Sequence, residues 1–350
     1  MIKKECFTAE WIEQVSSELH YNDKNLIEKV IRALSLLEML VKAGCPLVFK
    51  GGTALMLILG KSAHRLSIDI DLICPPGTNI EDYLKSFADF GFINLELVER
   101  KQRDDADIPK SHSKFFYQIA YRNDTDAQSY ILLDVLYEDI HYFRTQQIAI
   151  NCPFIRLEGK PLMVTVPSAE DILGDKLTAF APNTTGIPYY RNGRSCSMEI
   201  AKQLYDVGRL FENVSDLQIT KEAFRKIAVV ELSYRSFGTD IGQVFNDIRQ
   251  TALCISTRGK AGEGDFDLIQ DGIIRVKSFM YKQRYLIDHA IIDAARAAYL
   301  ATLIEKGINE IESYSNNPAD IKDMVIRPSL PNKLNKLRSN LPEAYYYWAK

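Results

Sequence analysis

The chain has 350 residues, 46% of them hydrophobic, which suits two compact units with apolar cores or one unit with a large extension, and argues against a disordered protein. Its 43 basic and 46 acidic residues are mixed along the chain, so any nucleic acid binding requires a local basic patch. No stretch predicts an export signal or a membrane span, and six scattered cysteines without a C-x-x-C pair argue against a zinc or disulfide scaffold. We therefore expect a cytoplasmic protein with no membrane partner.

The first elements in chain order are helices. Residues 8–44 predict two helices, the second from about Lys24 with apolar residues at helical spacing as far as Gly44. A short apolar strand at 47–49 leads into Gly51-Gly52, and Thr53 is expected to cap a short helix over 54–59. The stretch 68–74 begins with alternating apolar and acidic residues and predicts a strand.

The next segment predicts a helix over 80–90 and strands over 93–99, 115–122 and 130–137, with a hairpin loop at 101–113. A short strand at 163–166 precedes a helix that ends near Phe180, and the remainder is mostly helical to Gly307. The sequence thus predicts an α/β fold, with a mixed α/β core domain over 1–165 followed by a mostly helical domain over 166–350.

Three further stretches combine unusual residues. The loops 181–197 and 257–265 are rich in glycine and polar residues, and Tyr189, Tyr190, Arg191 and Arg194 of the first are typical both of a solvated loop and of a nucleotide or RNA contact. The C-terminal stretch joins Lys333, Lys336 and Arg338 to the aromatic run 345–348. We favour an aromatic tail packed on the helical domain over an RNA-binding surface.

Asp69 and Asp71 are the first candidates for chemistry. Being two apart on a strand, their carboxylates project from one face, and two like charges so close favour a cation between them. Mg²⁺ prefers oxygen ligands and a shell of carboxylates and phosphates. The alternative is a surface strand with alternating acids on its solvated face.

The glycine turn strengthens the first interpretation. Gly51, Gly52 and Thr53 lie where a strand ends and a helix begins, so backbone N–H groups can approach a triphosphate without obstruction by a Cβ atom. A tight turn of purely structural value has the same pattern.

Asp134 is a third acid, in a strand whose neighbours are almost all apolar. An unpaired charge there costs several kcal/mol, so it requires a partner or a metal. A buried salt bridge is one explanation. The other is a metal site in which three carboxylates hold cations that activate an acceptor hydroxyl and stabilise the departing pyrophosphate, with Asp134 as the third ligand and the base.

These motifs resemble the AbiEii/AbiGii toxin family of nucleotidyltransferases. The resemblance is carried by Phe49 to Leu55, Arg65 to Leu72, Asp171 to Ala179 and Lys202 to Val207, in this order along the chain. In the family an acid directly follows the lysine of the last motif, whereas this chain has Gln203 there. Lys202 and Asp206 match.

The resemblance implies that the core domain over 1–165 has a nucleotidyltransferase-like mixed β-sheet and that the C-terminal half is helical. It also implies a nucleotidyltransferase that uses Mg²⁺ to transfer NMP from an NTP to an acceptor such as a tRNA 3′ end. It also implies a toxin of a type IV toxin–antitoxin or phage-defence pair, with a cognate antitoxin as partner. Two alternatives stay open, namely transfer to a small molecule, as in antibiotic-modifying enzymes, and an inactive fold kept for binding.

The remaining candidates complete the expected site. Arg65 and Ser67 flank the acidic strand and are predicted to hold phosphate oxygens, as is Lys202, although a structural Arg–Asp pair is an alternative for Arg65. Lys176 and Asp206 each lie near the edge of a buried helical face, so both require a partner. They are expected either to act on the triphosphate and the acceptor or to form a Lys–Asp pair that joins two helices.

Overall fold

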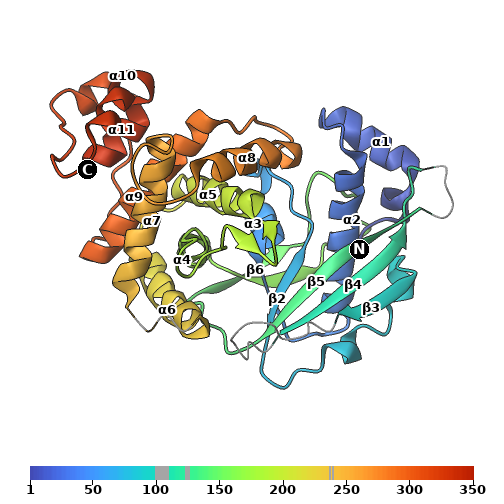
Figure 1. Ribbon diagram of the computed structural model, residues 1–350. Coiled ribbons are helices and arrows are strands. Elements are labelled where there is room, and N and C mark those ends of the chain that lie inside the picture. Colours follow the sequence, from blue (N-terminus) through green and yellow to red (C-terminus); the bar gives the residue numbers. More distant parts are fainter. Residues whose placement is uncertain (99–109, 123–126, 236–237, 239) are drawn as a thin grey trace. The chain divides into compact units, whose positions relative to one another are not determined.

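The structure is a computed structural model that describes residues 1–98, 110–122, 127–235, 238 and 240–350. These residues form two compact units, one of residues 1–168 and 278–284 and one of residues 169–277 and 285–350. Figure 1 labels the elements of both. Every helix in the described ranges is too short or too polar to cross a membrane.

The first unit contains the mixed α/β part of the chain. Its elements are α1 (Ala9–Glu18), α2 (Lys24–Lys42), β1 (Val48–Lys50), α3 (Gly51–Leu59), β2 (Ile70–Cys74), β3 (Asn94–Val98), β4 (Lys110–Gln118), β5 (Gln128–Tyr137), β6 (Thr145–Ala149) and β7 (Met163–Pro167). Within the described residues the main sheet has the strand order β1-β2-β5-β4-β3, while β6 pairs separately with β7. β2 and β5 are parallel, and the other neighbours in the main sheet are antiparallel.

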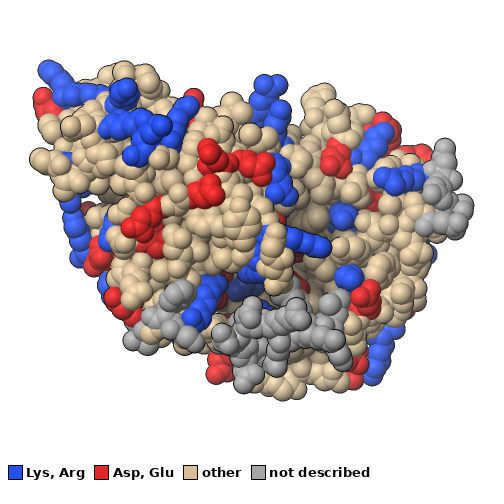
Figure 2. Space-filling model, viewed as in Figure 1, with Lys and Arg blue, Asp and Glu red and all other residues tan. Residues whose placement is uncertain are grey.

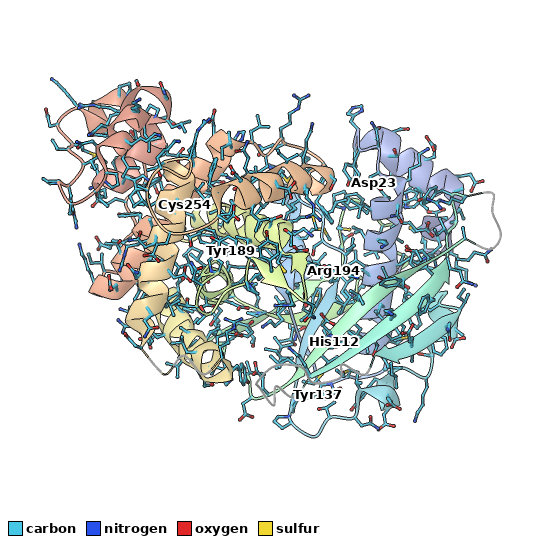
Figure 3. All side chains as sticks on the ribbon, in the orientation of Figure 1. Asp23, His112, Tyr137, Tyr189, Arg194 and Cys254 are labelled. Atoms are coloured by element: carbon cyan, nitrogen blue, oxygen red, sulfur yellow. The ribbon has the colours of Figure 1, made fainter. Side chains whose placement is uncertain are left out.

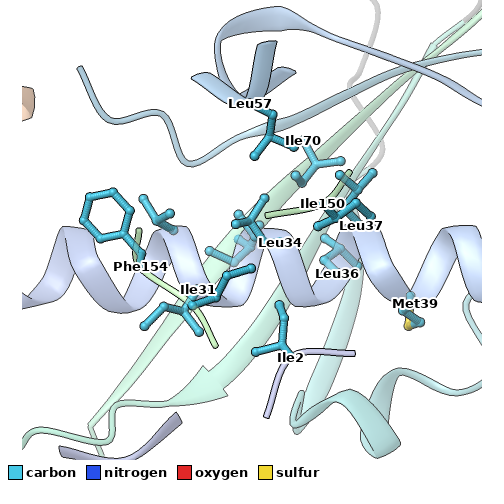
Figure 4. Close-up of a cluster of buried hydrophobic side chains, with 14 of the residues drawn as sticks. Ile2, Ile31, Leu34, Leu36, Leu37, Met39, Leu57, Ile70, Ile150 and Phe154 are labelled. Carbon is cyan, nitrogen blue, oxygen red and sulfur yellow. The ribbon is translucent and has the colours of Figure 1, made fainter. Parts of the chain in front are cut away.

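Helix α2 provides much of the core of this unit. It begins at Asp23, whose carboxylate accepts a hydrogen bond from the Leu26 N–H at 3.0 Å. Most of its apolar side chains are fully buried, and Figure 4 shows several of them among residues from the sheet and from neighbouring loops. This burial follows from the helical spacing of the apolar residues.

The main sheet has one apolar and one polar face. Ile131, Leu133 and Val135 of β5 are buried in the core cluster, whereas Asp134, between them in sequence, has a side chain 38% exposed. Because strand side chains alternate between faces, the acid lies on the face turned away from this core. The strand predicted over 130–137 is confirmed and begins at Gln128.

Residues 278–284 return to the first unit late in the chain. The Leu66 N–H donates to the carbonyl of Phe279 at 2.8 Å, and the Tyr281 N–H donates to the carbonyl of His64 at 3.0 Å. The Tyr281 hydroxyl also donates to the carbonyl of Ala63. This segment therefore anchors the stretch of backbone that leads into Asp69.

The second unit is largely helical, and its C-terminal aromatic residues 345–348 are buried as expected. Its elements are α4 (Ala169–Ala179), β8 (Tyr190–Arg191), β9 (Arg194–Ser195), α5 (Ser197–Phe211), α6 (Gln218–Tyr234), α7 (Ile241–Ser256), α8 (Phe266–Val276), α9 (Ile287–Lys306), α10 (Leu337–Asn340) and α11 (Pro342–Ala349).

A buried arginine ties three helices of this unit together. Arg296 of α9 donates to the Gly208 carbonyl of α5 at 3.2 Å, to Glu212 at the end of α5 at 3.0 Å, and to Glu343 of α11 at 2.6 Å. These charge-assisted bonds satisfy a guanidinium group that would be costly to bury alone.

The sequence predictions differ from the structure in several places. The helix expected over 80–90 is replaced by short 3-10 turns at Ile80–Tyr83 and Phe87–Phe90, because only Ile80 and Leu84 of this stretch are buried. The loop predicted at 101–113 is strand from Lys110 onward, and 101–109 lie outside the described residues. The strand β6 was not predicted.

Candidate functional site

Two of the candidate acids lie side by side in the main sheet. Asp71 of β2 is in direct register with Asp134 of β5. Lys50 of β1 is opposite Asp71, and His112 of β4 is opposite Asp134. Residues in direct register on neighbouring strands share a face and lie about 5 Å apart. A row of four polar residues, Lys50, Asp71, Asp134 and His112, therefore crosses the face turned away from the α2 core, with the acids in the middle.

The ring of His112 contacts Asp134 directly. Its Nδ1 atom is hydrogen-bonded to Asp134 Oδ1. His112 is only 9% exposed, and its Nε2 atom is buried with no hydrogen-bond partner among the described residues. Figure 3 labels this histidine among the side chains of the sheet.

Asp69 immediately precedes β2 and is held through its backbone. Its carbonyl accepts a hydrogen bond of 2.7 Å from the hydroxyl of Thr53, a residue that is fully buried. Burial lowers the pKa of Lys29 in α2, and the negative charges of Asp69 and Asp23 oppose that decrease. Lys29 therefore lies near Asp69. Asp69 thus has a fixed backbone and a cation nearby.

The glycine turn contacts the row directly. Gly51 has a φ of +77°, and a Cβ atom added to it would lie 2.1 Å from Asp71 Oδ2. A Cβ atom on Gly52 would lie 2.6 Å from Ser67 Oγ and 3.0 Å from Arg65 Nη2. No side chain fits at either position without displacing a candidate site residue, so the turn requires glycine here.

Helix α3 begins earlier than predicted. It starts at Gly51, and Lys50 stands at the N-cap position without a side-chain cap. The expectation that Thr53 caps this helix is wrong, because its hydroxyl is directed to the Asp69 carbonyl instead. The first N–H groups of α3, at Gly51 and Gly52, have no partner within the helix and lie beside the acids and Arg65. Arg65 itself is buried and donates to the Leu66 carbonyl at 2.9 Å.

The other candidates lie in the second unit. Lys176 of α4 and Asp206 of α5 form an ion pair with Nζ and Oδ2 2.9 Å apart, and both are buried. Lys176 also donates to Gln203 Oε1 at 3.0 Å, so the residue that departs from the family motif contacts this lysine. The pairing expected from burial is present. Lys202, also in α5, is partly buried.

The predicted loop 181–197 contains a short hairpin. Strands β8 and β9 pair across Asn192 and Gly193, which have φ angles of +51° and +73°. Tyr190 is 57% exposed. At the start of the loop, Asp247 of α7 accepts hydrogen bonds from the Asn183 side chain at 2.7 Å and the Thr184 hydroxyl at 2.8 Å. The loop is therefore anchored at its base with an exposed aromatic tip.

Three residues near the acids have no clear signal in the sequence. His112 falls in the predicted loop 101–113, whereas β4 begins at Lys110. Lys29 lies within the second predicted helix, and Lys50 belongs to the glycine motif. The register of the sheet, which brings Lys50 and His112 opposite the acids, has no local signal.

Within the described residues, no three His, Cys, Asp or Glu side chains are gathered into a complete metal site. The paired carboxylates nevertheless fit Mg²⁺, which typically takes one or two protein carboxylates and completes its shell with substrate phosphates and water. Asp71 and Asp134, in register on one face, carry hard oxygen donors of this kind, and Asp69 precedes β2 by one residue.

No curated protein matches the chain in sequence. Among solved structures, JHP933 from Helicobacter pylori is 16% identical with a TM-score of 0.40, and the match covers 80% of this chain and 94% of that one. MenT4, a nucleotidyltransferase toxin from Mycobacterium tuberculosis, is 13% identical with a TM-score of 0.43, covering 84% of this chain and 89% of that one.

The sequence model of one family matches the chain over residues 34–318, well over half of its length. That family is described as the nucleotidyl transferase AbiEii toxin of type IV toxin–antitoxin systems. The matched range includes the glycine turn, all three acids, and the Lys176–Asp206 pair. The chain therefore belongs to the AbiEii family of nucleotidyltransferase toxins.

Proposed function

We propose that this nucleotidyltransferase moves a nucleoside monophosphate from an NTP to the 3′ end of an RNA such as tRNA, in a Mg²⁺-dependent reaction. The transfer acts in the cytoplasm as the toxic activity of a toxin–antitoxin or phage-defence pair, and a cognate antitoxin restrains it. The observation that carries the proposal is the pair Asp71 and Asp134 in register beside the glycine turn. We further propose that the two compact units act as a nucleotidyltransferase core domain and a helical domain.

In the proposed reaction, Asp69, Asp71 and Asp134 hold the divalent cation, which when bound neutralises phosphate charge. The N–H groups of Gly51, Gly52 and Thr53 at the start of α3 bind phosphate oxygens, because helix N-termini favour anions. Arg65 and Ser67, which border the turn, contact the same phosphates. Asp134, which is partly exposed, accepts the proton of the acceptor hydroxyl.

We assign Lys176 to catalysis as a cation that stabilises developing phosphate charge, with Asp206 and Gln203 orienting its ammonium group. Lys202 is assigned to nucleotide binding. The family match supports both assignments, since both residues lie within the matched range.

A basic cluster in the second unit supports an RNA acceptor. The pKa of Lys333 is lowered, mainly by partial desolvation and to a smaller extent by the positive charges of Lys260, Lys336 and Arg258. These four residues therefore lie close together. All four are exposed. Figure 2 shows Lys and Arg gathered over the α10 and α11 end of this unit. In a chain of net charge −3, such a gathering is a local anion-binding surface.

The acids are tested by Asp69→Asn, Asp71→Asn and Asp134→Asn. Each variant should fold and lose transfer of labelled nucleotide to RNA by roughly a hundredfold or more, because each removes a ligand at the reacting phosphate. Asp89→Asn, which changes an exposed acid of the same unit, is the control. Expression of the wild type should slow growth, whereas expression of any of the three variants should not. Near-normal transfer or equal toxicity in any of them would refute its role.

The glycine turn is tested by Gly51→Ala against Gly44→Ala. Both glycines have φ near +76°, but a Cβ atom on Gly44 meets nothing within 4 Å, whereas on Gly51 it meets Asp71. Both variants should lose about 1–2 kcal/mol of stability to backbone strain. Only Gly51→Ala should also weaken Mn²⁺ binding and transfer. Equal Mn²⁺ affinity in both would mean that the glycine does not serve the metal site.

The role of Lys176 is tested by a single and a double substitution. Lys176→Met removes the ammonium group that pairs with buried Asp206 and should destabilise the fold by about 3–5 kcal/mol. The double variant Lys176→Met/Asp206→Leu replaces the ion pair with apolar side chains and should recover much of that stability. If Lys176 is catalytic, transfer per folded molecule stays absent in the double variant. Recovery of transfer together with stability would show that the pair is structural.

The basic cluster is tested by Lys333→Glu/Lys336→Glu. The KM for RNA should rise about tenfold and the salt dependence of RNA binding should fall by about two units of slope, because two phosphate contacts are lost. The KM for NTP should not change. Lys306→Glu, on an exposed position of α9, controls for net charge. An unchanged KM for RNA in the double variant would show that this basic cluster does not bind the RNA acceptor.

A further inference from the structure

The contact between His112 and Asp134 joins two consecutive strands, β4 and β5. Their Cα atoms are in register across the antiparallel pair β4 and β5, so the two side chains stand beside each other on the same face. The histidine is almost fully buried, while the side chain of Asp134 is 38% exposed. The buried histidine is therefore placed to fix the orientation of the more exposed Asp134 carboxylate.

The imidazole ring is oriented by a single hydrogen bond among the described residues. Nδ1 bonds to Asp134 Oδ1, and no described residue bonds to the buried Nε2. A buried polar ring in the middle of a strand is unfavourable unless its bonds are made, and an apolar β-branched residue would pack at this position at lower cost. The histidine is thus better explained by what it does to Asp134 than by packing.

The bond engages one of the two carboxylate oxygens. With Oδ1 held by His112, the rotamer of Asp134 is restricted and Oδ2 becomes the oxygen available to a ligand. Partners that hold a ligating carboxylate in this way usually contribute about 10- to 100-fold to metal affinity or activity. Such restriction is effective because small displacements of reacting groups are costly.

We propose that His112 is a positioning residue that orients the Asp134 carboxylate toward the divalent cation and the acceptor hydroxyl. This inference rests on the proposed function of Asp134. It assigns to β4 a part in a site to which β1, α3, β2 and β5 also contribute.

Two substitutions at this position separate positioning from packing. His112→Leu removes the hydrogen bond and keeps an apolar side chain in the strand, whereas His112→Asn keeps an N–H group close to the place of Nδ1. We expect His112→Leu to weaken Mn²⁺ binding, followed by electron paramagnetic resonance without substrate, by about 10- to 100-fold. Its kcat per folded molecule should fall by a similar factor with little change in the KM for RNA. His112→Asn should recover most of both.

The control is His141→Leu. His141 is also partly buried and pairs with a carboxylate, Glu138, at 3.7 Å, but it is not in the row. Mn²⁺ affinity and kcat should not change in this variant. Thermal melting of all variants corrects for the folded fraction.

Two outcomes would overturn the inference. One is that His112→Leu and His112→Asn lose stability alike and keep Mn²⁺ affinity, which would make His112 a packing residue. The other is that His112→Asn binds Mn²⁺ no better than His112→Leu. The same measurements on Asp134→Asn separate the proposal for His112 from the proposed function of Asp134. Unchanged Mn²⁺ affinity and transfer in that variant would refute the proposed role of Asp134 itself.

Discussion

The repulsion between Asp71 and Asp134 is the constraint around which the first unit is organised. Carboxylates on neighbouring strands stand about 5 Å apart, and two such charges repel by about 3 kcal/mol at an effective dielectric constant of about 20. A folded chain keeps them together only if the surrounding structure offsets that energy. The strands that hold them are buried on their other face, so neither acid can turn away without disturbing the core.

Three neighbouring residues bear on this repulsion. Lys50 is in register with Asp71, and its ammonium group lies 5.8 Å from the centroid of the Tyr142 ring. His112 is hydrogen-bonded to Asp134, and the charge of Asp69 acts on Lys29. The backbone contributes as well, since Gly51 leaves room for Asp71 and Thr53 restrains the Asp69 carbonyl. The result is a set of anionic groups held by the fold before any ligand arrives, which is the condition for efficient electrostatic catalysis.

The parts of this arrangement that the sequence predicts are the local ones. Gly51 and Asp71 belong to elements that follow each other in the chain, and the strand around Asp134 has a clear apolar pattern with one acid in it. The contact between Asp134 and His112 depends on where β4 begins and on its register against β5, and neither has a local signal in the sequence. The predicted capping role of Thr53 is wrong for a similar reason. Its hydroxyl donates to the carbonyl of Asp69, 16 residues away, instead of making a local capping bond.

The return of residues 278–284 to the first unit has a consequence for the order in which the protein matures during synthesis. The backbone that leads into Asp69 is braced by Phe279 and Tyr281, which leave the ribosome more than 200 residues later. Until then the segment that leads into Asp69 and Asp71 lacks its final hydrogen bonds, while much of the sheet can already form. A chain interrupted anywhere in the second unit before Phe279 would carry all three carboxylates without this brace. Full assembly of the site is thereby coupled to translation of about four-fifths of the chain, as the late position of this segment requires.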